Sequence, residues 1–126
     1  MVYQKLGKLD LALADFNKNI ELNPTGDSER QNYFHRAGIY RELKEFDKAL
    51  KDCESTIAMD PDTDTLVFSR STAFALRGDI LAEDLQLYRE AIEEYSRAIQ
   101  LDPENTILFS KRAAAVQALD QGQTAT

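Results

Sequence analysis

The chain has 126 residues, of which 43% are hydrophobic, and it carries a net charge of −7. This length suits one domain with a buried core, and the acidic balance disfavours nucleic acid, whose phosphates bind concentrated lysine and arginine. The longest apolar runs have four or five residues, so membrane insertion is not expected, and the N-terminus lacks the apolar core of a signal peptide. The single cysteine, Cys53, cannot form an internal disulfide, which favours a cytoplasmic location.

Three prolines, Pro24, Pro61 and Pro103, each end a similar stretch of sequence. An alanine stands twelve residues before each proline, an aromatic residue or cysteine eight before, and an isoleucine four before. A spacing of four places these residues on one face of a helix, and the alanine marks a close approach to a second helix. Each proline then stops its helix. The recurring residues are Ala12, Phe16 and Ile20; Ala49, Cys53 and Ile57; and Ala91, Tyr95 and Ile99.

A second periodic stretch follows each proline. These stretches predict helices over 28–43, about 63–77 and about 105–119, the first opened by a capping box of Ser28 and Gln31 and the second ended by Gly78. Their expected apolar faces are Tyr33, Ala37 and Tyr40; Val67, Ser71 and Phe74; and Phe109, Ala113 and Val116. The repeating unit is therefore a pair of antiparallel helices, helix A after one proline and helix B before the next.

This unit resembles the tetratricopeptide repeat (TPR), and the resemblance covers nearly the whole chain. It implies an all-α fold in which antiparallel helix pairs stack as a short right-handed α-solenoid. Residues 1–24 would form a partial first repeat, 25–61 the second and 62–103 the third, followed by a closing helix over 104–119 and a flexible tail over 120–126.

The chain departs from the family pattern in two ways. Arg36, Arg70 and Arg112 stand where the family has a leucine on helix A. The prolines are 37 and 42 residues apart, longer than the family repeat of about 34. Three extra residues fall in the linker at 25–29 and eight fall near 78–85. The eight are expected either to lengthen helix B back towards Ile80 or Ala82, or to form a protruding loop.

No group of residues suggests catalysis or a cofactor. His35, the only histidine, has no nearby nucleophile and is expected to be exposed on helix A. The alternating aspartates of 60–64 resemble the start of a calcium loop, but Thr65 and Ser71 stand where that loop needs glycine and glutamate. We therefore expect no enzyme activity, no metal and no cofactor.

Nine of the eleven aromatic residues fall on the repeated apolar positions and are expected in the core. They are Tyr3, Phe16, Tyr33, Tyr40, Phe46, Phe74, Tyr88, Tyr95 and Phe109. Phe34 and Phe68 lie outside this stripe, at the place on helix A that faces the concave groove in the family. Each either anchors a ligand or packs against a neighbouring helix.

The resemblance implies a protein–protein interaction module, an adaptor, scaffold or co-chaperone-like protein, that binds a peptide or helix in a groove lined by the A helices. The carboxylate clamp of chaperone cofactors is not matched, since only the last of the corresponding residues fits: Phe34, Gly38, Ser69, Ile107 and Lys111. The alternatives are a fragment of a longer TPR protein or a self-associating repeat domain. The first helix B, from about Leu9, lacks a full helix A, so weak homodimer formation is expected.

The charges of the two helix types differ. The A helices carry seven basic and three acidic residues, and the B helices seven basic and fourteen acidic residues. A comparatively basic groove would suit an acidic or C-terminal peptide with an apolar anchor. Alternatively, the arginines pair with acids on adjacent helices. The candidate groove residues are Gln31, Phe34, His35, Arg41, Phe68, Ser69, Thr72 and Lys111.

Overall fold

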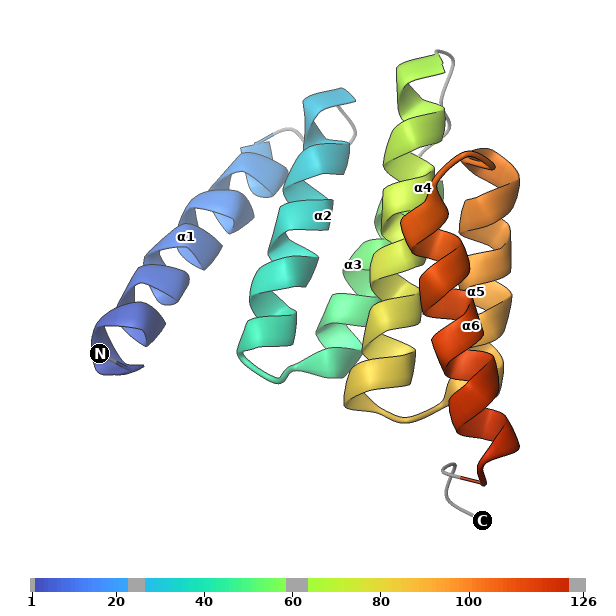
Figure 1. Cartoon of the computed structure of the whole chain (residues 1–126). Helices are drawn as coiled ribbons and strands as arrows, with labels where there is room; N and C mark the ends of the chain where they lie inside the picture. Colours follow the sequence, from blue (N-terminus) through green and yellow to red (C-terminus); the bar gives the residue numbers. More distant parts are fainter. Residues whose placement is uncertain (1, 23–26, 59–63, 123–126) are drawn as a thin grey trace. The chain divides into compact units, whose positions relative to one another are not determined.

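The computed structural model describes the backbone of residues 2–22, 27–58 and 64–122, and the side-chain surroundings of 7–22, 31–58 and 70–122. Within these residues the chain forms helices joined by short connections, with no strand (Figure 1). None of the described helices is long and apolar enough to cross a membrane. The chain folds as two compact units, Met1–Met59 and Asp60–Thr126. The expected all-α fold of paired helices is confirmed.

The first unit contains α1 (Val2–Leu22), α2 (Asp27–Glu42) and α3 (Phe46–Ala58), and α2 packs against both of the others. Figure 1 shows α2 and α3 as an antiparallel pair. The first helix B was expected to begin at about Leu9, but α1 is one continuous helix that runs through Gly7. A lone glycine costs a helix only about 1 kcal/mol, too little to interrupt it. The contacts of Ser28 in the expected capping box lie outside the described side chains.

The core of the first unit forms where α3 approaches α2. Ala37, Ala49 and Cys53 are fully buried, which confirms the predicted close contact at the alanine and the apolar role of the cysteine. Thr56, which stands where the family has a second alanine, is also buried, and its hydroxyl donates to the carbonyl of Asp52 at 3.0 Å. This local hydrogen bond satisfies the polar group that the substitution brings into the core.

The second unit contains α4 (Asp64–Asp79), a π-helical turn η1 (Ile80–Asp84), α5 (Tyr88–Leu101) and α6 (Thr106–Asp120). Here α5 packs against α4, η1 and α6. Ala91 and Ala98 of α5 are fully buried, again as the repeat predicts. Ser71 of α4 is buried and donates to the carbonyl of Ala98 at 3.1 Å, so its hydroxyl ties the two helices together.

The eight extra residues neither lengthen helix B nor protrude, so both expectations were wrong. They extend helix A, because α4 runs through Gly78 and continues into η1, and α5 begins only at Tyr88. Ile80 is fully buried, which explains why this segment stays against the core rather than projecting as a loop. The expectation that Gly78 ends the helix was also wrong. The glycine is needed for space, since a Cβ there would lie 2.6 Å from the ring of Tyr95.

The apolar face expected for the last helix is not the buried one. Phe109 is 42% exposed and Val116 48% exposed, whereas Leu108 and Ala115 are buried, and Ala115 packs with Ala91 and Tyr95 of α5. The expectation of Phe109 in the core was therefore wrong, because α6 packs on α5 through a different face. Of the other eight aromatics, Phe74 and Tyr95 are buried and Tyr3 lies outside the described side chains. The remaining five are half-buried: Phe16, Tyr33, Tyr40, Phe46 and Tyr88.

The alanine contact yields a first prediction. Replacing Ala49 or Ala91 by leucine should destabilise the fold by about 1–3 kcal/mol, because the added carbons have no space between the helices. Ala14→Leu, at an exposed position of α1, is the matched control and should melt like the wild type. Thermal unfolding followed by circular dichroism measures all three. Wild-type melting of the Ala49 and Ala91 variants would show that the helix register is wrong.

A second prediction compares two helical glycines. Gly78→Ala should destabilise the second unit, because the new Cβ would overlap the ring of Tyr95. Gly38→Ala, in α2, meets nothing within 4 Å and should stabilise the fold by up to about 1 kcal/mol, the usual gain of alanine over glycine in a helix. Urea unfolding curves of the two variants should therefore shift in opposite directions. Shifts of the same sign would contradict the packing at Gly78.

Candidate partner-binding surface

Two candidate groove residues in the first unit form an aromatic cluster with α1. The exposed His35 of α2 stacks on Phe16 of α1, with ring centroids 5.6 Å apart and an interplanar angle of 26°. Phe34 is half-buried and presents its ring edge-on to His35 at 5.8 Å. Phe34 thus packs against its neighbour while part of its ring stays accessible. A ligand could meet a surface made of one imidazole and one phenyl ring here.

Arg36 links all three helices of the first unit. Its Nε and Nη2 each donate to a carboxylate oxygen of Asp52 on α3 at 2.7 Å, and its Nη1 donates to the side-chain oxygen of Asn17 on α1 at 2.8 Å. The Asp52 side chain is only 5% exposed and that of Arg36 is 18% exposed. A bidentate ion pair of this kind fixes the orientation of both side chains.

The surroundings of Arg36 hold it in its charged form. The hydrogen bonding that Arg36 donates to Asp52 is the main cause that raises the pKa of Arg36 above its usual value, against the opposing effect of burial. The guanidinium also lies over the rings of Tyr33 at 5.4 Å and Tyr40 at 5.6 Å. Because Asp52 neutralises it, Arg36 adds little net positive charge to the surface. For this arginine the alternative of pairing with an acid on an adjacent helix is confirmed.

Lys111 in the second unit is bound to a carboxylate. Its ammonium group donates to both oxygens of Asp79 at 2.8 Å, and the hydroxyl of Tyr95 donates to one of them at 2.6 Å. The Asp79 side chain is 14% exposed and that of Lys111 is 32% exposed. The contact joins the end of α4 to α6. The candidate groove cation is therefore neutralised by a residue just before the extra turn.

The other helix A arginines differ in their partners. Arg112 donates to the hydroxyl of Ser96 on α5 at 3.1 Å and lies over the ring of Phe109. Arg70 has a buried Nε without a hydrogen-bond partner. Glu94 of α5, which corresponds to Asp52 in the repeat, lies 3.5 Å from Arg77 instead. The pairing of a helix A arginine with a helix B acid thus recurs, but in the second unit a later arginine makes it.

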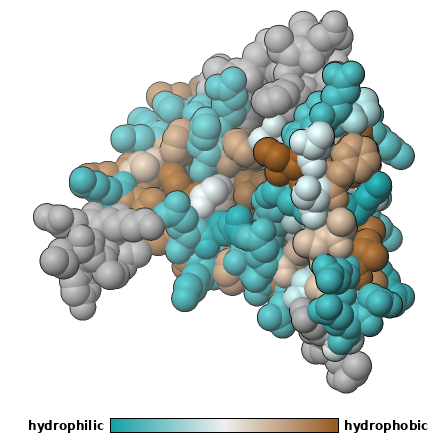
Figure 2. All heavy atoms as spheres, in the orientation of Figure 1, coloured by the Kyte–Doolittle hydropathy of each residue, from teal (hydrophilic) through white to brown (hydrophobic). Residues whose placement is uncertain are grey.

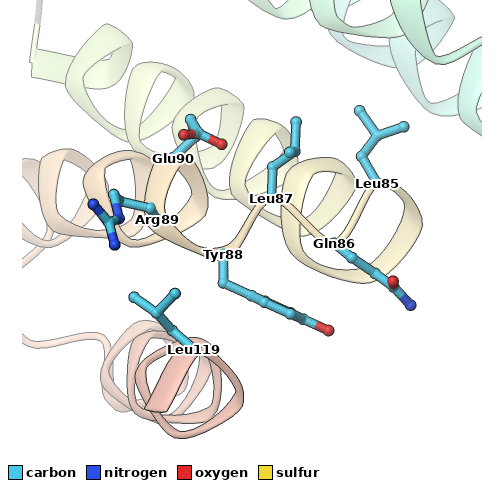
Figure 3. Close-up of a pocket in the computed structure, with 7 residues that line it drawn as sticks. All are labelled: Leu85, Gln86, Leu87, Tyr88, Arg89, Glu90 and Leu119. Carbon is cyan, nitrogen blue, oxygen red and sulfur yellow. The ribbon is translucent and has the colours of Figure 1, made fainter. Parts of the chain in front are cut away.

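A half-open hollow of about 370 Å³ lies where the α4–α5 connection meets the end of α6. Figure 3 shows the ring of Tyr88 and the side chain of Leu119 facing the same space. Gln86 in the connection has a φ of 57°, a left-handed conformation that turns the chain into α5. The residues that line the hollow are Leu85, Gln86, Leu87, Tyr88, Arg89, Glu90 and Leu119. Its mixed character suits an apolar side chain with a polar neighbour.

The candidate residues are divided between the units. Gln31 is exposed on α2, while Arg41 on α2 and Thr72 on α4 are half-buried. Phe68 and Ser69 lie in α4, but their side chains lie outside the described ones. The structure brings Phe34 and His35 together in the first unit. Asp79, the partner of Lys111, was not predicted, and its only signal in the sequence was that it is a carboxylate within the eight extra residues.

The Arg36–Asp52 contact yields a third prediction. Asp52→Ala should destabilise the fold by on the order of 3 kcal/mol, because it leaves a largely buried guanidinium without its carboxylate. Glu45→Gln, which removes the exposed pair with Lys48 at 3.1 Å, should have no measurable effect. Chemical denaturation of both variants gives the comparison. Equal stabilities would mean that the Arg36 network does not hold the unit together.

Comparisons with known proteins agree with the repeat. A tetratricopeptide repeat model matches residues 1–25 and 31–63, and a TPR repeat model matches 84–120. Stress-induced-phosphoprotein 1 of Caenorhabditis elegans is 27% identical over 98% of this chain, and the Hsp70-Hsp90 organizing protein of Triticum aestivum 34% identical over 81%. Small glutamine-rich tetratricopeptide repeat-containing protein 2 of Mycosarcoma maydis is 27% identical over 90%. The chain spans only 32%, 17% and 29% of the lengths of these relatives. This chain belongs to the tetratricopeptide repeat family.

Proposed function

We propose that this chain is a non-enzymatic adaptor module that binds a peptide or helix of a partner protein. One observation carries the proposal: most of the chain is similar to repeat proteins, one of which is named as an organizer of Hsp70 and Hsp90. A chaperone-associated role is therefore the first to test. Helical repeats suit such a role because they present extended surfaces for recognition.

The proposed binding surface lies on the A helices. On the first unit the Phe34–His35 cluster supplies an apolar anchor, and Arg41 lies in the last turn of the same helix. The partner is then an acidic peptide, at a C-terminus or within a chain, with one apolar side chain.

The residues at the clamp positions bear on how such a peptide would be held. Phe34, Gly38 and Ser69 stand at clamp positions and cannot form ion pairs with a terminal carboxylate. Lys111 stands at a further clamp position and is already bound to both oxygens of Asp79. We therefore propose recognition without the carboxylate clamp, in which apolar contact gives affinity and charge mainly speeds association.

A fourth prediction tests this surface with labelled C-terminal peptides of Hsp70 and Hsp90 and a basic peptide of equal length. The double variant His35→Glu with Arg41→Glu should bind the chaperone peptides at least ~10-fold more weakly than the wild type does. Added salt should slow the association of the wild type with these peptides. Lys111 is left unchanged, because a glutamate there would face Asp79.

The matched control is Lys18→Glu with Lys51→Glu, two exposed sites on α1 and α3. It makes a similar change of charge on B helices and should bind like the wild type. Equal binding by both double variants would remove the α2 surface from consideration. If neither chaperone peptide binds, the chaperone class of partner is wrong.

A further inference from the structure

The exposed face of α6 corresponds to a face that is covered in the first unit. In α2 the face formed by Tyr33, Ala37 and Tyr40 is buried or half-buried, and Ala37 is fully buried. The corresponding residues of α6 are Phe109, Ala113 and Val116, and all three are exposed. In Figure 2 the atoms of hydrophobic residues, in brown, reach the surface among those of polar residues. The face of α6 therefore has the composition of a helix A that packs on a helix B, but no described helix covers it.

Arg112 of α6 makes part of the contacts that Arg36 makes in α2. Arg36 donates through Nη1 to Asn17, and Arg112 donates through Nη1 to Ser96; both acceptors stand seven residues before a repeat proline. Each guanidinium lies over the ring three residues before it, at 5.4 Å for Arg36 and 5.5 Å for Arg112. Arg36 then completes its contacts with Asp52. Among the described residues, no acid on a helix B pairs with Arg112 as Asp52 pairs with Arg36.

An acid at that helix B position is buried in both complete pairs. Asp52 and Glu94 each stand nine residues before a proline, are 3% and 5% exposed, and contact an arginine of the preceding helix A. The third residue at this position is Asp15 of α1, and it is exposed. Ala12 of α1 is half-buried, although its counterparts Ala49 and Ala91 are fully buried. The helix B face of α1 is thus exposed at the acid and partly exposed at the alanine.

We propose that α1 of one molecule docks on α6 of a second copy of this chain and completes a helix pair between the two molecules. Arg112 would pair with Asp15 of the second copy, as Arg36 pairs with Asp52 within the first unit. Phe109 and Val116 would cover Ala12 and its neighbours. A second copy is the favoured occupant because α1 has both the open alanine and the complementary charge at the required spacing.

The association is head to tail, since the two surfaces differ. Contacts of this kind build rings when the rotation closes and open chains when it does not. This goes beyond the proposed adaptor function, because it concerns how modules join and not what their groove binds. Peptide binding and self-association can therefore fail independently in experiment.

Sedimentation velocity of the 126-residue chain over a wide concentration range tests the proposal. The wild type should sediment faster as concentration rises. Asp15→Arg and Arg112→Glu should each weaken self-association at least ~10-fold, since each sets like charges against one another in the interface. An equimolar mixture of the two variants should regain association. In the mixture, the arginine introduced by Asp15→Arg meets the glutamate introduced by Arg112→Glu. At the other contact, the unchanged Asp15 of the Arg112→Glu variant meets the unchanged Arg112 of the Asp15→Arg variant.

Two controls separate this contact from other causes. Asp10→Arg on α1 and Gln117→Glu on α6 change the charge at exposed positions. Around the helix axis, each position is rotated by about a third of a turn or more from Asp15 or Arg112. Both variants should associate like the wild type. Circular dichroism confirms that all variants are folded. The proposal is overturned if the wild type stays monomeric at every concentration. It is also overturned if the two charge variants associate like the wild type, or if their folded mixture does not regain association.

Discussion

The close contact between the two helices of each pair determines most of what else this chain does. Ala49 and Ala91 are fully buried, so α3 and α5 approach their A helices where a larger side chain would have no room. The acid three residues later on the same helix, Asp52 or Glu94, is then carried to the edge of the contact. There it meets an arginine of helix A. The ion pairs are a consequence of the register that the alanine sets.

An arginine in place of the family leucine changes what the interior of a repeat contributes. A leucine would add apolar burial, whereas the buried pair of Arg36 and Asp52 gains little net stability over an apolar substitute. Its directional bonds to Asp52 and Asn17, however, define how α1, α2 and α3 lie against one another. The same bonds neutralise the charge. Counting basic residues on the A helices therefore overestimates how positive their surface is.

Because the sequence repeats, much of the fold could be predicted from it. The parts that could not be predicted are those where the chain departs from the repeat. Because three prolines align the chain, the pairing of helices and the buried Ala49, Cys53 and Ala91 followed from the sequence. The course of the extra residues did not, since a π-helical turn with a buried Ile80 has no periodic signal. The exposure of Phe109 was missed for a related reason: periodicity shows which face is apolar but not whether a neighbouring helix covers it. For the binding surface, the sequence indicated Lys111 as a cation, while its partner Asp79 became visible only when α4 and α6 were placed together.

The extra turn also alters the chemistry of the second unit. Because α4 runs on past the point where its helix was expected to end, Gly78 lies against the ring of Tyr95 and the next residue, Asp79, reaches its hydroxyl. A side chain on residue 78 would push that ring away and separate the hydroxyl from the carboxylate. With the ring in place, Asp79 accepts from Tyr95 and Lys111 together, so a carboxylate with little exposure has donors for both of its oxygens. Lys111 is therefore held in an ion pair within this unit, and a ligand could bind its ammonium group only by displacing Asp79. The extra residues, Gly78 and the Asp79–Lys111 pair thus depend on one another, which explains why Lys111 serves packing here at a position where the carboxylate clamp of chaperone cofactors has a cation.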